Sequence, residues 1–337
     1  MQPTKATQSI TASPTLPPFA RCTATLCAVL LSGSVSAAGG SCSNATDLAD
    51  DACGATVRAD LFLARAVCAD VPGANAREAC RTTANRVAAD SREQCTAQEQ
   101  ARKRLCKKLG DGPYNPPFRA SNFVTAAAAA AQPNTYFPLI PGMRQVYRGE
   151  GETNVIEVLN EYKLINGVQC RTVHDTVSRN IEGHDVVLED TQDWFAQDLA
   201  GNVWYCGEIS QRFEYVSDDH AAELVGIGGS WKALREHAKP GVVMFAHPEV
   251  GRVYRQEFDL GNAEDFARIV SKTASYTATV GSCNGTCVVT RDYTPLDPGH
   301  VEIKVYSPGF GLIKEIDPET REVTLELVEM STPVVPM

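Results

Sequence analysis

The sequence predicts an α+β protein in which an N-terminal α-helical hairpin, laddered with disulfides, precedes an antiparallel β barrel or sandwich. Three observations predict this fold class. Six cysteines before residue 107 are placed symmetrically along the chain, the periodicity changes from helical to two-residue alternation near residue 136, and short turn sequences separate the later apolar segments.

Residues 1–37 have the pattern of a signal peptide. A polar start ends in Arg21, an apolar stretch follows, and Ser34 to Ala37 form a small-residue cleavage site. The apolar stretch is too short to span a bilayer, and no later segment approaches about 20 apolar residues, so we expect no transmembrane segment. Lipidation of Cys42 is disfavoured because Gly39 stands where a branched apolar residue is expected. We expect a periplasmic or secreted protein.

Ten cysteines remain once Cys22 and Cys27 are removed with the signal peptide, six before residue 107 and four after it. Even numbers in both regions of an exported protein indicate disulfides. A zinc site is disfavoured because the chain has no Cys-x-x-Cys pair, and the six-cysteine region has no histidine.

The six N-terminal cysteines are symmetric about residue 74, next to the turn signal Pro72-Gly73. We expect a domain of residues 38–109 with one helix over about 46–70 and a second over about 76–108. If these helices fold back on each other as a hairpin, each cysteine of the first helix lies opposite one cysteine of the second. Spacings of 15 and 11 residues keep the cysteines of each helix on one face. The predicted disulfides are Cys42–Cys106, Cys53–Cys95 and Cys68–Cys80. These cross-links supply stability that two helices with few large apolar residues lack.

Residues 110–135 are rich in proline, glycine and alanine and predict a partly flexible linker. Residues 136–330 predict the β domain, and 331–337 a tail. Asn166-Gly167 predicts a tight hairpin, and a second hairpin turns at 198–201. Further strands are expected at 143–150, 252–259, 268–280, 286–293, 301–307, 311–316 and 321–329, with 219–238 helical or irregular. Short strands joined by short turns predict an antiparallel meander that closes into a barrel or sandwich.

Several β-domain segments share motifs with known proteins. The motifs are Tyr136-Phe-Pro-Leu-Ile-Pro-Gly142, Asp193-Trp-Phe-Ala-Gln-Asp198 with Gly201-Asn-Val-Trp-Tyr205, Thr294-Pro-Leu-Asp-Pro-Gly299, and Tyr306-Ser-Pro-Gly-Phe-Gly-Leu312. Over about residues 134–316 the chain resembles a family of uncharacterised bacterial secreted or periplasmic β-rich proteins. No activity is established for that family, so the resemblance implies a fold and a location but no mechanism.

The same resemblance bears on the four later cysteines. Cys170 and Cys287 fall where the family often has cysteine, whereas Cys206 stands where an aromatic residue is expected. The resemblance therefore implies the pairs Cys170–Cys287 and Cys206–Cys283. The alternative joins Cys283 to Cys287 across an Asn-Gly-Thr turn and leaves Cys170 with Cys206.

Charge and motifs exclude several functions. The net charge of −10 disfavours nucleic acid and anionic membrane surfaces as partners. The segment 281–285 resembles a nucleophile elbow with Cys283, but strand-forming residues follow it directly, so a disulfide-bearing hairpin is the better interpretation. The glycine-rich segment 226–231 follows no strand of a βαβ unit, which disfavours nucleotide binding. We expect no cofactor and assign no catalytic residue, and an enzyme is disfavoured.

Two sets of residues are candidates for binding. The first is aromatic, comprising Trp194, Trp204 and Tyr205, with His247 in a proline-bearing loop. Because neighbours alternate in a strand, one half of the aromatic set is core. The other half either covers the core or an edge of the sheet, or lines a concave face for an apolar or sugar ligand. The second set is Asp185, Glu189 and Asp193, which alternation places on one strand face, as oxygen ligands for Ca²⁺ or as a solvated acidic face.

Three functional hypotheses follow. The first is an exported protein whose β domain binds a small apolar ligand or an envelope protein. The second is a secreted hydrolase or metal-dependent enzyme that uses His247 and nearby carboxylates. The third is a structural protein whose helical hairpin is a docking arm. The sequence does not determine the oligomeric state.

Overall fold

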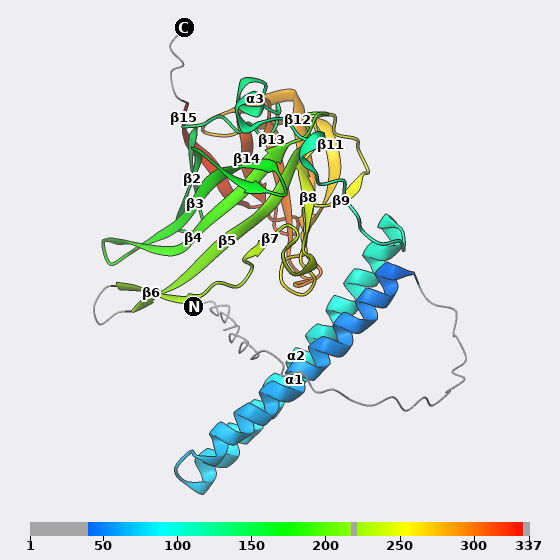
Figure 1. Ribbon diagram of the computed structural model, residues 1–337. Helices are drawn as coiled ribbons and strands as arrows, with labels where there is room; N and C mark the ends of the chain where they lie inside the picture. Colours follow the sequence, from blue (N-terminus) through cyan, green and yellow to red (C-terminus); the bar gives the residue numbers. More distant parts are fainter. Residues whose placement is uncertain (1–39, 217–220, 333–337) are drawn as a thin grey trace, which may run out of the picture. The chain divides into compact units, whose positions relative to one another are not determined.

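The computed structural model describes residues 40–216 and 221–332, so the expected signal peptide lies outside the described residues (Figure 1). Two long helices precede a large antiparallel β barrel that is nearly closed, which confirms the predicted fold class. Within the described ranges, no helix is both long enough and apolar enough to cross a membrane.

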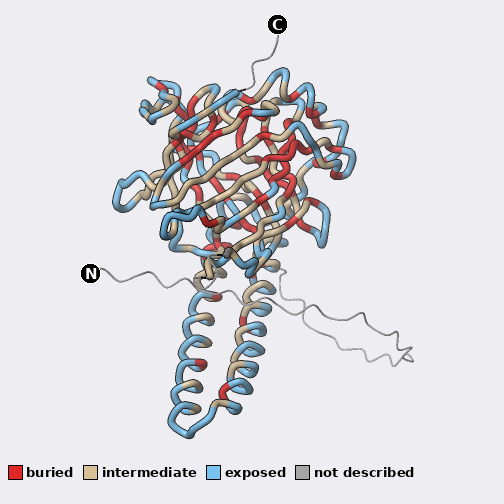
Figure 2. Tube along the Cα trace, turned by 90° about the vertical axis from the view of Figure 1, so that its left-hand side faces the viewer, coloured by how far each residue is buried: buried red, intermediate tan, exposed pale blue. Residues whose placement is uncertain are grey.

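The helices are α1 (Ser41–Ala69) and α2 (Ala74–Leu109). They are joined at Gly73, whose φ of 87° favours glycine. The three predicted disulfides of the hairpin are confirmed: Cys42–Cys106, Cys53–Cys95 and Cys68–Cys80. Most of the hairpin surface is exposed (Figure 2), and its larger apolar side chains Leu63, Val67 and Val87 are 67%, 61% and 51% exposed. The disulfides, rather than a wide apolar interface, therefore join the two helices.

The segment that follows the hairpin packs against the barrel. It contains the short helix α3 (Ala126–Ala131), which is the alanine run. Phe118 and Phe123 are buried, and the Val124 amide donates to the Gln197 carbonyl at 3.1 Å. The segment expected to be a partly flexible linker therefore lies along the barrel wall in this part, because its two phenylalanines belong to a buried apolar cluster of the barrel.

The strands follow the order of the chain. They are β1 (Arg144–Gly149), β2 (Glu152–Ile165), β3 (Val168–Ile181), β4 (His184–Gln197), β5 (Val203–Val216), β6 (Ala221–Gly226), β7 (Trp231–Lys232), β8 (Lys239–Met244), β9 (Val253–Arg255), β10 (Glu257–Phe258), β11 (Phe266–Thr277), β12 (Ser282–Tyr293), β13 (Val301–Ser307), β14 (Gly311–Ile316) and β15 (Val323–Ser331). The segment 219–238, expected to be helical or irregular, contains β6, β7 and a single 3₁₀ turn at Arg235–His237.

The strand order is β10-β8-β5-β4-β3-β2-β1-β15-β14-β13-β12-β11-β9, in which β1 to β5 and β11 to β15 form two meanders of sequence neighbours. Pairing of β15 with β1 joins the two halves, while β6 and β7 pair with β5 beside this path. The ends of the order are β10 and β9, which only Gln256 separates in the chain, so the barrel nearly closes there.

The β-domain disulfides correct the pairing that the resemblance implied. Cys170 pairs with Cys206, and Cys283 pairs with Cys287, which is the alternative arrangement. The physical reason is the strand order: Cys170 on β3 and Cys206 on β5 flank β4 in one buried cluster, whereas β12 brings both other cysteines into a different cluster.

Candidate functional site

A cavity of about 300 Å³ lies inside the barrel. Its walls come from most of the long strands and from the segment that precedes β1. Strand alternation explains this lining, since every second residue of each strand faces inward. One part of the wall is apolar and includes Phe137, Leu139, Val158, Val173, Phe195 and Val243. The volume falls at the lower end of the range of small-molecule sites.

The remaining wall is strongly acidic. The ionisable residues that line the cavity, apart from tyrosines, are Asp175, Asp193, Glu257, Asp265, Asp292, Glu315 and Lys304. Lys304 is the one base among them, and its ammonium pairs with Glu315 at 3.1 Å and Glu302 at 3.2 Å. The other five carboxyl groups have no basic ion-pair partner among the described residues. Carboxylates held in a barrel interior without a cation are costly, because burial disfavours their charge.

Strands β4 and β5 build the centre of this acidic wall. Asp193 lies directly opposite Glu208, and the Tyr205 hydroxyl donates a hydrogen bond to Asp193 Oδ1. The Tyr205 ring stacks on Phe195 with 4.7 Å between the ring centroids, and it meets the edge of Trp231 at 5.4 Å. These aromatic contacts hold the phenol beside the carboxylates, where it links the apolar and acidic parts of the wall.

Burial shifts the acids toward their neutral forms. Desolvation, reinforced by the neighbouring Asp193 and Glu189, raises the pKa of Asp175 to about 8. Desolvation and the nearby Glu208 raise the pKa of Asp193 to about 8. Burial also raises the pKa of Glu208 to about 7 and that of Asp292 to about 6. Near neutral pH, Asp175 and Asp193 therefore hold protons that a bound cation would displace.

Two cavity carboxylates have an oxygen without a hydrogen bond. Glu257 and Asp292 are 6% and 8% exposed, and Glu257 Oε2 and Asp292 Oδ1 are buried without a partner among the described residues. The Trp231 indole and the Thr290 hydroxyl lie near them without reaching hydrogen-bond geometry. Buried acceptors of this kind are suited to a donor from a ligand.

Only part of the aromatic set lines the cavity. Tyr205 lines it. Trp194 is instead buried on the other face of the sheet, in the apolar cluster that contains Cys170 and Cys206, and the Lys163 ammonium lies 4.1 Å from the centroid of its ring. The Trp204 indole nitrogen donates to Asp198 Oδ2 at 2.8 Å and also lies outside the cavity lining. His247 is exposed in the loop after β8 and is not among the lining residues.

The structure does not assemble the three carboxylates considered for Ca²⁺. Asp193 lines the cavity, but Asp185 is exposed and accepts from Asn180 at 2.8 Å, while Glu189 accepts from Thr191 at 2.9 Å. A β-bulge between Val187 and Glu189 breaks the alternation on which the prediction depended. Across the described ranges, the one group of three potential metal ligands lying within 4.8 Å is Cys42, Cys106 and Asp111, and both cysteines are in a disulfide.

Sequence reasoning missed Asp175, Glu257, Asp265, Asp292 and Lys304. The sequence contained a signal for Asp175: it stands two residues after Val173 on β3, so both side chains lie on the same face of the strand. Alternation identifies a shared face but does not say whether that face is inside or outside when both faces contain polar residues. Closure of the barrel decides which side is the interior.

Comparisons of the chain with protein-family models, with curated proteins and with solved structures find no match. The resemblance to secreted β-rich proteins therefore stays a prediction.

Proposed function

We propose that this protein binds a small ligand inside its barrel, and that the ligand combines an apolar body with a cationic group such as a protonated amine. Five cavity carboxyl groups without a basic partner, facing an apolar wall, support this proposal. The five disulfides support export of the protein, because such bonds persist in oxidising compartments. This ligand keeps the apolar body predicted from the sequence and adds a cationic group.

The cavity chemistry favours an organic cation over a hydrated metal ion. A divalent metal requires several oxygens converging on one point. The cavity acids do not form such a group among the described residues, and they are spread around the wall beside Phe195 and Val173. A protonated amine needs only one to three acceptors, and its hydrocarbon part gains from apolar burial at about 25 cal/mol per Å².

The test uses calorimetric titration with a matched series: phenethylamine, 2-phenylethanol and phenylacetate. At pH 8 we expect the amine to bind at least about tenfold more tightly than the alcohol, equivalent to about 1.4 kcal/mol, and the acid more weakly still. Asp193→Asn should remove most of the preference for the amine. Asp190→Asn is the matched control, since Asp190 lies on the same strand, is outside the cavity lining and pairs with His174 at 2.9 Å.

Two results would contradict the proposal. Equal affinity for the amine and the alcohol would exclude the cationic group. Failure of every amine in a series of increasing chain length to bind would exclude the cavity as the site. Proton release on amine binding, measured in buffers of different ionisation enthalpy, provides a second readout, because displaced protons come from the acids with raised pKa.

A further inference from the structure

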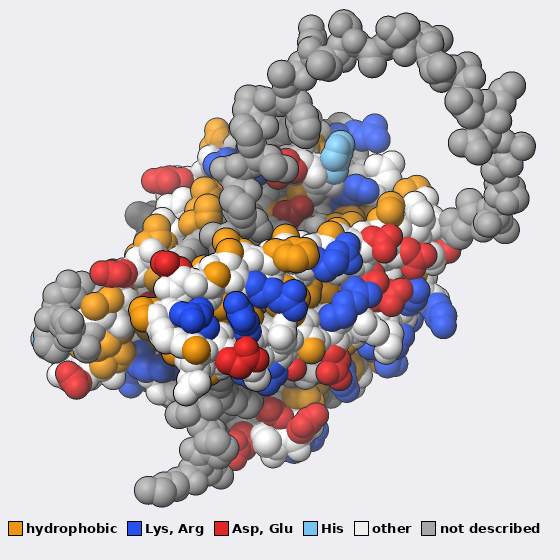
Figure 3. Space-filling view, turned by 90° about the horizontal axis from the view of Figure 1, so that it is seen from below, with side chains coloured by type: hydrophobic (Ala, Val, Ile, Leu, Met, Phe, Trp, Pro, Cys, Tyr) orange, Lys and Arg blue, Asp and Glu red, His pale blue; other side chains and the backbone are white. Residues whose placement is uncertain are grey.

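A second pocket, of about 280 Å³, lies between α2 and the outer face of β11 and β12, and it is independent of the barrel cavity. Four of its lining residues are basic: Arg104, Lys108, Arg268 and Arg291. Among the residues that the structure describes, no aspartate or glutamate lines it. The chain as a whole has 41 acidic and 31 basic residues, and the face seen in Figure 3 carries both kinds of side chain. Apart from Tyr293, the ionisable residues that line this pocket are therefore all basic, although the chain as a whole is acidic.

The two arginines of the sheet oppose each other. Arg268 and Arg291 are cross-strand partners on β11 and β12, and both are exposed. Their neighbours Ala267 and Asp292 are buried on the inward face, so both guanidinium groups stand on the outer face. Like charges directly opposite in a sheet are destabilising. Neither arginine forms an ion pair with another described residue, so the repulsion is not offset within this part of the chain.

The helix contributes its two cations from one face. Arg104 and Lys108 are four residues apart, which places them on the same side of α2. Neighbouring Lys103 pairs with Glu99 at 2.6 Å and Asp47 at 3.1 Å. Arg104 and Lys108 have no such partner among the described residues. The acidic start of α1 therefore neutralises only part of the basic end of α2.

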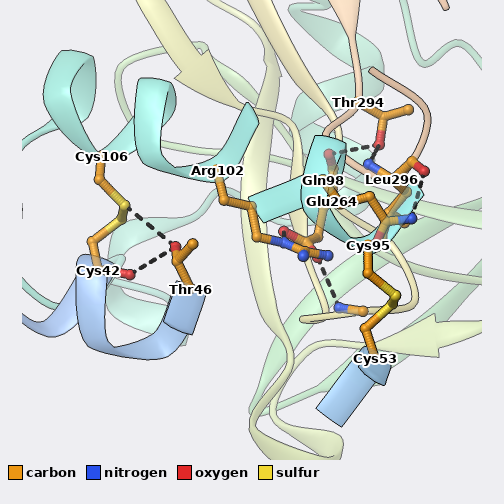
Figure 4. Close-up of polar contacts among 11 residues, drawn as sticks. Cys42, Thr46, Cys53, Cys95, Gln98, Arg102, Cys106, Glu264, Thr294 and Leu296 are labelled. Carbon is orange, nitrogen blue, oxygen red and sulfur yellow. Dashed lines mark hydrogen bonds and ion pairs between the residues drawn. A yellow bond between two sulfur atoms is a disulfide. The ribbon is translucent and has the colours of Figure 1, made fainter. Parts of the chain in front are cut away.

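Contacts beside the pocket hold its walls in place (Figure 4). The Arg102 guanidinium donates to both carboxylate oxygens of Glu264 at 2.8 to 3.1 Å, and the Gln98 side chain donates to the Leu296 carbonyl at 2.8 Å. The Thr294 hydroxyl donates to the Glu264 carbonyl at 3.1 Å. These bonds join α2 to the segment before β11 and to the loop that follows β12, so the backbones that carry the four cations are held together without a ligand. Such preorganisation reduces the entropy lost on binding.

Tyr293 supplies an independent observation. It lines the same pocket, its ring stacks on Phe266, and its hydroxyl is buried without a hydrogen-bond partner among the described residues. Arg268 and Arg291 both lie close enough to act electrostatically on this hydroxyl. A phenol beside two guanidinium groups offers one more donor to an anion.

We propose that this pocket binds a phosphoryl group. Arginines recognise phosphate oxygens in bidentate fashion, and a compact dianion relieves the repulsion between Arg268 and Arg291. Pro295, Pro298 and Val301 form an apolar part of the lining, which suits an organic group attached to the phosphate. A soluble phosphate ester and the headgroup of an anionic lipid share this chemistry.

The test titrates the full exported chain with pyrophosphate at constant ionic strength set with chloride. We expect saturable binding, and we expect Arg268→Gln/Arg291→Gln to weaken it at least about tenfold. The control is Arg148→Gln, because Arg148 is exposed on β1, far from the pocket lining. Unchanged affinity in the double variant, or an effect of pyrophosphate no larger than that of chloride, would overturn the proposal.

A second readout separates binding from a structural role. Without anion and at low salt, the double variant should unfold at a higher temperature than the unmodified protein, because one repulsive pair is gone. A lower unfolding temperature would mean that the arginines stabilise the fold, which overturns the argument from repulsion. Co-sedimentation with phosphatidylglycerol vesicles that pyrophosphate reverses would assign the lipid source, and pyrophosphate binding without co-sedimentation would assign the soluble ester.

Discussion

At the scale of single residues, the acids of the barrel interior lower the free energy of unfolding by an amount that depends on pH. Asp193 is 9% exposed, and its neighbours are a tyrosine, a phenylalanine and another acid. An ionised carboxylate is poorly solvated there, so the neutral form is favoured and the pKa is raised to about 8. The same arrangement that prepares the cavity for a cation therefore destabilises the empty protein at alkaline pH.

The first prediction concerns this pH dependence. The folded-state pKa of about 8 for Asp175 and Asp193 exceeds the ordinary value, so their favourable contribution is complete at acidic pH and is lost as the pH rises through 8. Urea unfolding should show a lower free energy of unfolding at pH 9 than at pH 6. At pH 9, Asp193→Asn should be more stable than the unmodified protein by about 1 to 3 kcal/mol. Asp190→Asn should lack this gain, and equal stabilities of Asp193→Asn and the unmodified protein at pH 9 would refute the assignment.

At the scale of elements, disulfides join the two helices of the hairpin, and a buried ion pair attaches α2 to the barrel. Arg102 on α2 and Glu264 before β11 are 5% and 1% exposed, and their side chains are joined by three hydrogen bonds. Glu264 also accepts from the Gly261 amide at 2.8 Å. A buried pair of this kind adds little net stability compared with apolar residues, but loss of one partner leaves an unpaired buried charge.

The second prediction tests that joint. Arg102→Met should lower the free energy of unfolding by about 3 to 5 kcal/mol, because Glu264 then keeps only its bond to the Gly261 amide. The double variant Arg102→Met/Glu264→Gln should recover part of this loss. Denaturant unfolding of the two single variants and the double variant gives the coupling energy, and additive losses would show that the two groups do not act as a pair.

At the scale of the whole molecule, the barrel has a weak seam at β8, β9 and β10, where the sheet nearly closes and β9 and β10 do not pair with each other. β8 and β10 pair only through Pro240 with Glu257 and Lys239 with Phe258, whereas β3 and β4 pair continuously from Arg171 to Ile181 apart from one bulge. Proline also lacks the amide hydrogen that a ladder bond requires. Local opening of the barrel wall is easiest where the ladder is short, and few backbone bonds hold this seam.

The third prediction follows from this seam. Backbone amides of residues 239–244 and 253–258 should exchange with deuterium faster than those of 168–179, because local opening is easiest where the ladder is short. A cavity-bound amine should slow exchange at the seam. Uniform exchange over both regions would exclude the seam as the preferred opening.

Much of the fold follows from local sequence. The hairpin disulfides were predictable because their symmetric spacing about Pro72-Gly73 already encodes which cysteines lie level. The strands at 301–307 and 311–316 were predictable from alternation between clear turns, and the structure has them at those bounds. Both signals arise within a few turns of helix or within one strand, where chain geometry is regular.

The cysteine pattern and the periodicity together determined a disulfide-linked α+β protein. Only the tertiary structure decided that Cys170 forms a disulfide with Cys206. It also decided that Tyr205 and Asp193 line the barrel cavity, whereas Trp194 packs on the opposite face of the sheet. It further brought basic residues of α2, β11 and β12 into one pocket. The physical reason is that each of these facts depends on which strands become neighbours and which face the closed sheet encloses. A period of two in the sequence cannot distinguish the two faces.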